Sequence, residues 1–135
     1  MSNKITYIKA FNNYLFEFID DIQKMFPENN DIAITNTFLK TIKSTNVSLI
    51  IKLWYSSIYV PYEKEIESGN VDFFFTKEYK EDFDNHTFSN IDEIMNAIDK
   101  LRTPFLQMNE NKKNDARLYI QNLSKMSYLY HKSIM

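Results

Sequence analysis

The sequence predicts an all-α single domain, a bundle of five to six helices around a central aromatic-rich helix. Its 135 residues include one glycine and three prolines, which leaves few positions for the tight turns that a meander of strands needs. Apolar residues recur every three or four positions over long stretches, as they do on the buried face of a helix. The length fits one domain, residues 1–135, with room for a sizeable core.

Two helices are predicted in the first third of the chain. The first covers residues 5–26 and ends at Pro27, because proline has no amide to donate and restricts the residue before it. After a polar turn, Asp31 is a suitable N-cap for a second, shorter helix. One side of that helix carries Phe38, Leu39 and Ile42.

The central helix is predicted over residues 47–67, with Asn46 as its N-cap. Pro61 lies inside this stretch and is expected to kink or split the helix. Gly69 fits the left-handed conformation that often follows the C-terminus of a helix. Thr76 is then expected to cap a short helix that carries Tyr79 and Phe83.

Residues 73–75, three consecutive phenylalanines, fall in the connector between these two helices. Neither a helical stripe nor strand alternation buries three rings in a row, so two are expected to point inward. We expect Phe73 and Phe75 to be buried and Phe74 to be partly exposed, next to Tyr62 or Tyr79.

The last third of the chain predicts two further helical stretches. Ser89 with Asp92, or Asn90 with Glu93, is a capping box for a stretch that runs to residue 108 and restarts at Pro104. Residues 109–115 are a linker or an exposed first turn. The final helix is expected to bury Ala116, Tyr119, Ile120, Leu123, Met126 and Tyr130.

Composition argues against several kinds of site. The chain has no cysteine, which excludes disulfides, thiolate metal sites and cysteine nucleophiles. Phosphate-binding loops need several glycines, so nucleotide-dependent catalysis of the common kinds is not expected. His86 and His131 lie far apart and neither belongs to a metal-binding spacing. We therefore predict no catalytic residue, no cofactor and no metal site, and a protein that is not an enzyme.

Charge and hydropathy set the expected partners. A formal charge of −2 argues against a dedicated polyanion binder, although nucleic-acid binding is kept as a second alternative. Residues 47–55, the most apolar stretch, are interrupted by Ser48 and Lys52 and are too short to cross a bilayer. A soluble protein without a membrane span is therefore expected. Two loose basic groups motivate the nucleic-acid alternative: Lys40, Lys43 and Lys52, and Lys112, Lys113, Arg117 and Lys125.

Aromatic residues make up 16% of the chain and supply the candidate partner-binding residues. Residues 54–62 place aromatic rings on at least two faces of the predicted central helix. A core helix is the favoured interpretation, but tyrosine is also enriched where one end of a ring is buried and the other is wet. The candidates for partner binding are Trp54, Tyr55, Tyr59, Tyr62, Phe74 and Tyr79.

Three segments carry a resemblance to a small helical family: residues 11–32, 50–82 and 119–132. The middle segment, IIKLWYSSIYVPYEKEIESGNVDFFFTKEYKED, is the most specific. In these segments the chain resembles proteins encoded by nucleocytoplasmic large DNA viruses, including mimivirus-like giant viruses. The resemblance implies a viral protein made in the host cytoplasm and a candidate component of the virion, and it implies no activity.

The expected function is that of a non-enzymatic structural or protein-interaction protein of a large DNA virus. Its partner would be another copy of the chain, forming a homo-oligomer, or a different viral or host protein. The first alternative is a binding module that captures an amphipathic helix of a host protein in a hydrophobic groove. An exposed apolar patch next to Trp54 would favour that alternative, and a fully buried Trp54 would count against it.

Overall fold

The computed structural model describes residues 3–76 and 89–135, and every element in these ranges is a helix. The all-α prediction is confirmed for this part of the chain. No described helix is both long enough and apolar enough to span a membrane. The elements are α1 (Lys4–Met25), α2 (Asn30–Thr45), α3 (Leu49–Trp54), the π-helix η1 (Tyr55–Tyr59), α4 (Glu63–Glu67), α5 (Phe73–Thr76), α6 (Ser89–Asp99), α7 (Arg102–Leu106) and α8 (Glu110–Ser133).

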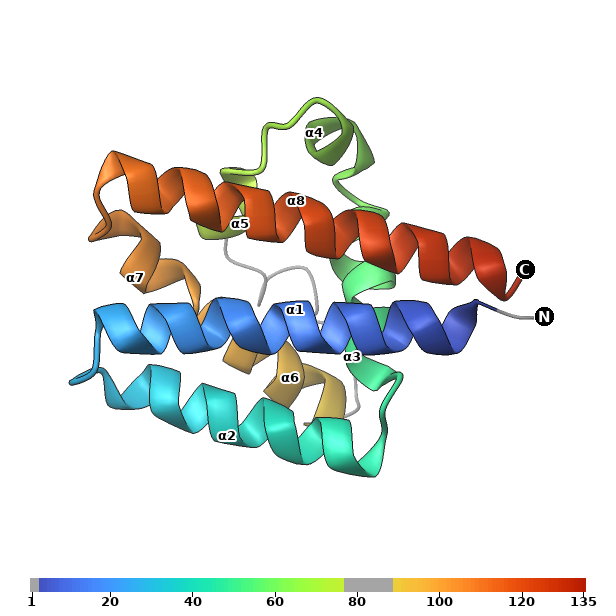
Figure 1. Ribbon diagram of the computed structural model, residues 1–135, viewed down its shortest axis with the longest axis horizontal. Coiled ribbons are helices and arrows are strands. Elements are labelled where there is room, and N and C mark those ends of the chain that lie inside the picture. Colours follow the sequence, from blue (N-terminus) through green and yellow to red (C-terminus); the bar gives the residue numbers. More distant parts are fainter. Residues whose placement is uncertain (1–2, 77–88) are drawn as a thin grey trace.

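The two longest helices, α1 and α8, pack together in antiparallel orientation and form the main contact of the fold (Figure 1). Helix α2 lies along the other side of α1, so that these three helices make one layer. The shorter helices α3, α5, α6 and α7 pack behind this layer in the view of Figure 1, and α4 projects beyond α8. The chain leaves α8 beside the start of α1, at the same end of the molecule.

Helices α1 and α2 begin and end where local chemistry requires. Helix α1 ends at Met25, two residues before Pro27, as predicted. The predicted N-cap of α2, Asp31, is wrong: Asn29 is the cap, and its Oδ1 accepts from the amide of Ile32 at 3.3 Å. Asp31 instead lies in the first turn, where a carboxylate is favoured by the helix dipole.

The predicted helical region over residues 47–67 begins at Leu49 and divides into α3, η1 and α4. Asn46 ends α2 instead of capping the next helix, and Asn12 holds the following turn by donating from Nδ2 to Val47 O at 2.9 Å. After Trp54 the helix widens into η1, where the amide of Val60 donates to Tyr55 O at 2.9 Å. The split at Pro61 is confirmed, because the chain turns there before α4.

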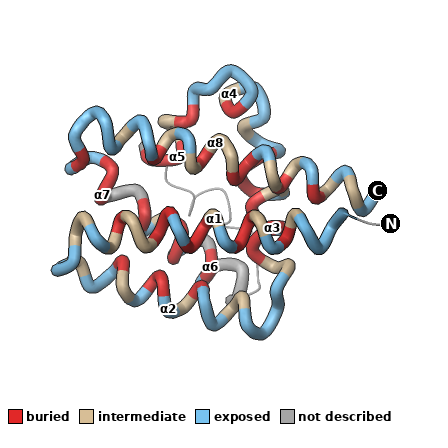
Figure 2. The backbone as a smooth tube through the Cα atoms, in the orientation of Figure 1, coloured by how far each residue is buried: buried red, intermediate tan, exposed pale blue. Residues whose placement is uncertain are grey.

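Trp54 lies at the centre of the core, with no exposed surface. Its Nε1 donates to Ser124 Oγ of α8 at 3.0 Å. Its ring meets Phe11 of α1 edge-on at 5.6 Å and stacks on Phe74 of α5 at 5.5 Å. Buried residues concentrate where the helices face one another, as Figure 2 shows. The third helical region therefore supplies the central side chain, while α1 and α8 supply the main packed pair.

The three phenylalanines belong to α5, so the prediction of a connector over residues 73–75 is wrong, and the helix that Thr76 was expected to cap lies outside the described residues. Phe74 is 0% exposed and Phe75 is 3% exposed, which confirms two inward rings but exchanges Phe73 for Phe74. Phe75 stacks on Phe105 of α7 at 3.8 Å. Phe73 is partly exposed and stacks on Tyr62 at 4.4 Å, the expected neighbour of the third ring. Successive helical residues point about 100° apart, which explains this distribution.

The last helices agree in outline with the sequence. Helix α6 starts at Ser89, and the predicted capping side chains at Ser89, Asn90 and Asp92 lie outside the described part. Pro104 is the third residue of α7 instead of the first. Asn109 caps α8 by accepting at Oδ1 from the amide of Lys112 at 2.9 Å, so the polar stretch 110–115 is helix. The predicted short helix with Tyr79 and Phe83 lies outside the described residues.

Replacing Phe74 by alanine is expected to lower the free energy of unfolding by about 3–5 kcal/mol, because the ring fills the core beside Trp54. Phe73→Ala is the matched control, with an expected loss well below that because Phe73 is partly exposed. Urea unfolding of both variants measures the difference. Equal losses at the two positions would contradict the assignment of Phe74 to the core.

Gly69 has a φ of +83°, which confirms the predicted left-handed conformation after α4. An added Cβ would meet Gln121 Nε2 at 3.8 Å, an ordinary contact, so the cost of Gly69→Ala comes from the backbone. We expect a loss of about 1 kcal/mol in the free energy of unfolding. Gly69→Asn is expected to lose less, because asparagine tolerates this conformation better. A loss for asparagine as large as for alanine would contradict this explanation.

Candidate functional site

The six predicted partner-binding residues do not form one surface. Trp54 and Phe74 have no exposed area, so neither presents its ring to a partner in this structure. Tyr79 lies outside the described residues. Tyr55 and Tyr62 are partly exposed, and Tyr59 is 3% exposed at the base of the same region.

Tyr55 and Tyr59 belong to a stacked row of rings between η1 and α8, here called the aromatic seam (His131, Tyr55, Tyr59 and Tyr128). The His131 ring stacks on Tyr55 with centroids 4.0 Å apart and planes at 10°. Tyr55 stacks on Tyr59 at 5.6 Å, and Tyr59 meets Tyr128 at 5.2 Å. The Nζ of Lys132 lies 5.4 Å from the centroid of the Tyr128 ring. The seam combines one buried ring with three that are partly exposed.

The buried end of the seam is fixed by a hydrogen bond. The Tyr59 hydroxyl donates to Glu67 Oε1 of α4 at 2.8 Å. Burial, followed by this bond and the charge of Glu67, raises the pKa of Tyr59 well above its usual value. The ring is therefore held between η1, α4 and α8 as a neutral donor.

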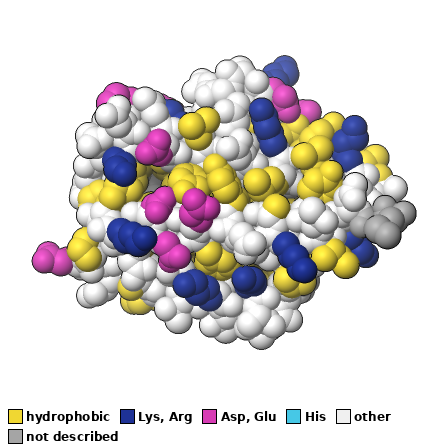
Figure 3. Space-filling model, viewed as in Figure 1, with side chains coloured by type: hydrophobic (Ala, Val, Ile, Leu, Met, Phe, Trp, Pro, Cys, Tyr) yellow, Lys and Arg dark blue, Asp and Glu magenta, His cyan; other side chains and the backbone are white. Residues whose placement is uncertain are grey.

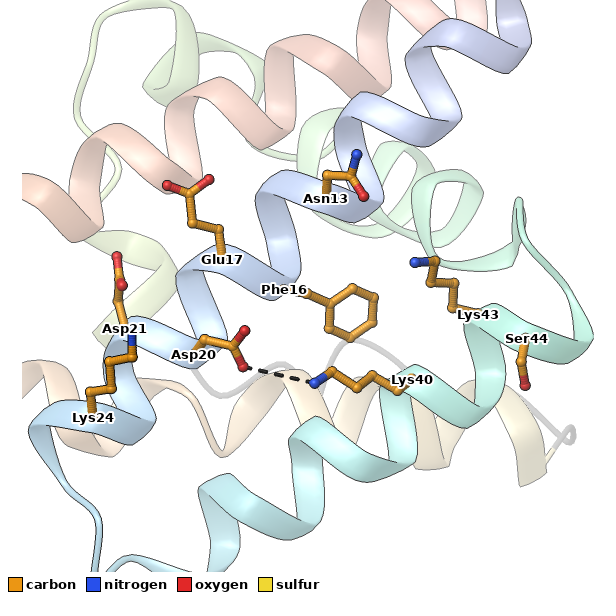
Figure 4. A pocket seen from close by; sticks show the side chains of 9 residues that line it. All are labelled: Asn13, Phe16, Glu17, Asp20, Asp21, Lys24, Lys40, Lys43 and Ser44. Atoms are coloured by element: carbon orange, nitrogen blue, oxygen red, sulfur yellow. Dashed lines mark ion pairs between the residues drawn. The ribbon is translucent and has the colours of Figure 1, made fainter.

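A second feature, which the sequence did not predict, is a cleft between α1 and α2 with a volume of about 610 Å³. On the face in Figure 3, acidic side chains gather over the second half of α1 and lysines over the neighbouring part of α2. Phe16 lies between the two helices in Figure 4. The α1–α2 cleft is lined by Asn13, Phe16, Glu17, Asp20, Asp21, Lys24, Lys40, Lys43 and Ser44.

Asp20 is held in place from α2. The Asn36 amide, which is mostly buried, donates from Nδ2 to Asp20 Oδ1 and to Gln23 Oε1, each at 2.9 Å. Lys40 Nζ lies 3.9 Å from the same Asp20 oxygen. The Asp20 carboxylate is thus positioned by a buried amide, while its ion pair with Lys40 is long.

The other two carboxylates of the cleft, those of Glu17 and Asp21, point toward α8. Tyr119 of α8 donates its hydroxyl to Asp21 Oδ2 at 2.8 Å, and Glu17 Oε1 lies 3.3 Å from the same hydroxyl. Burial raises the pKa of Tyr119 well above its usual value, and the bond to Asp21 and the charges of Asp21 and Glu17 add to this. One phenol proton therefore lies between two acidic side chains of α1.

The charged residues of this cleft could be recognised in part from their spacing in the sequence. Glu17, Asp20 and Asp21 follow one another at the spacing of a helix face, and Lys40 and Lys43 do the same. The sequence placed the two lysines in a basic group for nucleic acid. The structure sets them opposite carboxylates of α1 instead, a pairing that requires knowing how α1 and α2 pack.

In the second basic group of the sequence, at least Arg117 and Lys113 make contacts within the fold. Arg117 donates from Nε and Nη2 to the Asp72 carboxylate at 2.7 and 3.3 Å, and from Nη1 to Glu110 at 2.9 Å. Lys113 Nζ lies 5.3 Å from the Phe105 ring. Arg117 thus holds the segment before α5 and is not presented as a free cation. In the ranges 3–76 and 89–135, no three histidine or acidic side chains are placed to hold a metal ion.

A smaller groove of about 300 Å³ lies between α2 and α6. Its lining is largely apolar and includes Phe38, Ala97 and Ile34, which is 64% exposed. Glu93 of α6 and Lys100, which follows that helix, line the same groove.

The chain matches no protein-family model, no curated protein and no solved structure. The resemblance to proteins of large DNA viruses therefore stays a prediction, carried by the three segments named above.

The phenols of Tyr59 and Tyr119 are expected to ionise well above the usual pKa of tyrosine, because burial and neighbouring carboxylates raise both pKa values. The stability that they contribute is complete below about pH 10 and is lost as the pH rises further. Phenolate absorbance, followed from about pH 9 into strong alkali, measures the ionisation of the nine tyrosines. Tyr119→Phe should remove one late-ionising group, and an unchanged late phase would contradict the assignment.

Proposed function

We propose that the chain is a non-enzymatic protein-interaction or structural protein of a large DNA virus, made in the host cytoplasm and associated with the virion. The aromatic seam is the observation that supports this proposal best. Its rings stack on one another and on α8, so their orientations are set before any partner arrives. Binding then costs little further side-chain entropy, a property of effective interface residues.

The exposure of the seam suits a partner surface. Tyr55, Tyr128 and His131 are partly exposed, while Tyr59 anchors the row below them. Tyrosine combines a large apolar ring with a hydroxyl that tolerates water, and it is enriched among the residues that dominate binding energy. The π-helix that carries Tyr55 and Tyr59 adds weight, since such segments are frequent at functional sites.

The binding of an amphipathic helix is a second candidate function. Trp54 is fully buried, which counts against a helix-binding patch beside it. The groove between α2 and α6 offers a different place, because exposed Ile34 and partly buried Phe38 supply apolar area along two adjacent helices. A nucleic-acid role is the weakest of the three, given the net charge of −2 and the use of Arg117 within the fold.

Affinity capture from infected cells, with mass spectrometry and a count of the protein in purified virions, tests the proposal. We expect specific protein partners whose recovery falls about tenfold or more for a Tyr55→Ala/Tyr128→Ala variant, because both rings would lie in the interface. Tyr7→Ala is the matched control, a partly buried tyrosine on α1 outside the seam.

Two results would contradict the proposal. Absence of specific partners together with absence from virions would exclude an interaction or structural role in infection. Equal loss of partners for the seam variant and the Tyr7 control would show that the seam is not the interface. Circular dichroism of all variants separates loss of binding from loss of fold.

A further inference from the structure

The α1–α2 cleft contains both signs of charge in equal number. Three carboxylates line it, all from α1, against three ammonium groups, of which Lys40 and Lys43 come from α2 and Lys24 comes from α1. A polyanion would meet the three carboxylates, and a polycation would meet the three lysines. The lining therefore favours an occupant that itself carries both signs.

The charges are arranged in order along the cleft. Helices α1 and α2 run in opposite directions, so Phe16 lies level with Lys43, and Asp20, one turn later on α1, lies level with Lys40 (Figure 4). One turn of helix advances the chain by about 5.4 Å. A basic pole at Lys43 is thus followed, about one turn along, by an acidic pole at Asp20.

Lys43, Lys40 and Asp20 are available to a ligand, whereas Glu17 and Asp21 are engaged by the Tyr119 hydroxyl. Lys43 lies 5.6 Å from the centroid of the Phe16 ring and forms no ion pair within the described residues. The Asp20–Lys40 pair is 3.9 Å long, with side chains 48% and 54% exposed, so it contributes little and opens easily. Asp20 itself stays in position through the Asn36 amide.

We propose that the α1–α2 cleft binds an α-helix of a partner protein that carries an acidic and a basic side chain one turn apart. The acidic side chain pairs with Lys43, and with Lys40 once its long pair with Asp20 has opened, and the basic side chain pairs with Asp20. Side chains at i and i+4 on one helix face have the spacing that the two poles require. This inference rests on the proposed function for the class of ligand, a protein, and uses a different surface from the aromatic seam.

The hollow shape of the cleft favours a helix over a second copy of the same face. Two concave faces placed against each other would leave a void between them, whereas the convex surface of a helix fills a groove between two others. Phe16 and the methylene stems of the lysines then cover the apolar part of the bound helix.

Selection of peptides against the full chain tests the proposal. The probe is a displayed library of helix-forming peptides of about 16 residues, or about 24 Å of helix. We expect enriched peptides to combine acidic and basic residues one turn apart. Their affinity should fall about tenfold for the Lys43→Glu/Asp20→Lys variant, because each pole then repels its partner charge. Reversing the two charges on the peptide should restore binding to that variant.

The Lys125→Glu/Glu63→Lys variant is the matched control, with the same two reversals at exposed positions of α8 and α4. Failure to enrich peptides, or peptides that bind the cleft variant as tightly as the unchanged chain, would overturn the proposal. Peptides that carry charges of one sign only and bind equally tightly would also overturn it. So would a single-stranded DNA oligonucleotide that binds the unchanged chain but does not bind the cleft variant. If infected cells yield partners that depend on the seam alone, the cleft proposal fails and the proposed function stands.

Discussion

The fold depends on how one large side chain, Trp54 of α3, packs against three other helices. Its ring meets Phe11 of α1 and Phe74 of α5, and its indole nitrogen donates to Ser124 of α8. Ser124 in turn donates to Ile120 O at 2.8 Å, so both polar groups are satisfied without water. An indole N–H buried without a partner would cost about 1–3 kcal/mol, so this bond also fixes the register of α8 against α3.

The position of Trp54 also explains where the exposed aromatic rings lie. Trp54 ends α3, and the chain then widens into η1, which carries Tyr55 and Tyr59 toward α8. Pro61 cannot donate a backbone hydrogen bond, which removes the ladder that would continue α3 as one straight helix. The seam is thus a direct extension of the core: η1 continues from Trp54 and carries Tyr59, which is buried, and Tyr55, which is partly exposed. The α1–α2 cleft lies apart from this extension and depends on how α2 packs on α1.

Periodicity and caps in the sequence were sufficient for the helical class, for the end of α1 before Pro27 and for the conformation of Gly69. These sequence patterns were not sufficient where tertiary packing determines the local structure. Residues 73–75 lack a periodic pattern, and only the positions of Trp54 and Phe105 determine which rings are buried. Asn29 and Asp31 are both acceptable caps, and the turn after Pro27 selects the former. Recognising the cleft requires knowing which residues of α1 face which residues of α2. The spacing of residues along the sequence does not show this.

The contact between α1 and α8 joins parts of the chain that are far apart in sequence, as in the bond between Tyr119 and Asp21, which are 98 positions apart. Helix α1 is translated before α8, and the part of its apolar face that packs on α8, including Phe18 beside Tyr119, has no partner until α8 has left the ribosome. Closing so long a loop is slow, and this part of α1 is exposed meanwhile. The contact between α1 and α8 therefore forms only after translation of α8, and until then the exposed side chains of α1 favour aggregation.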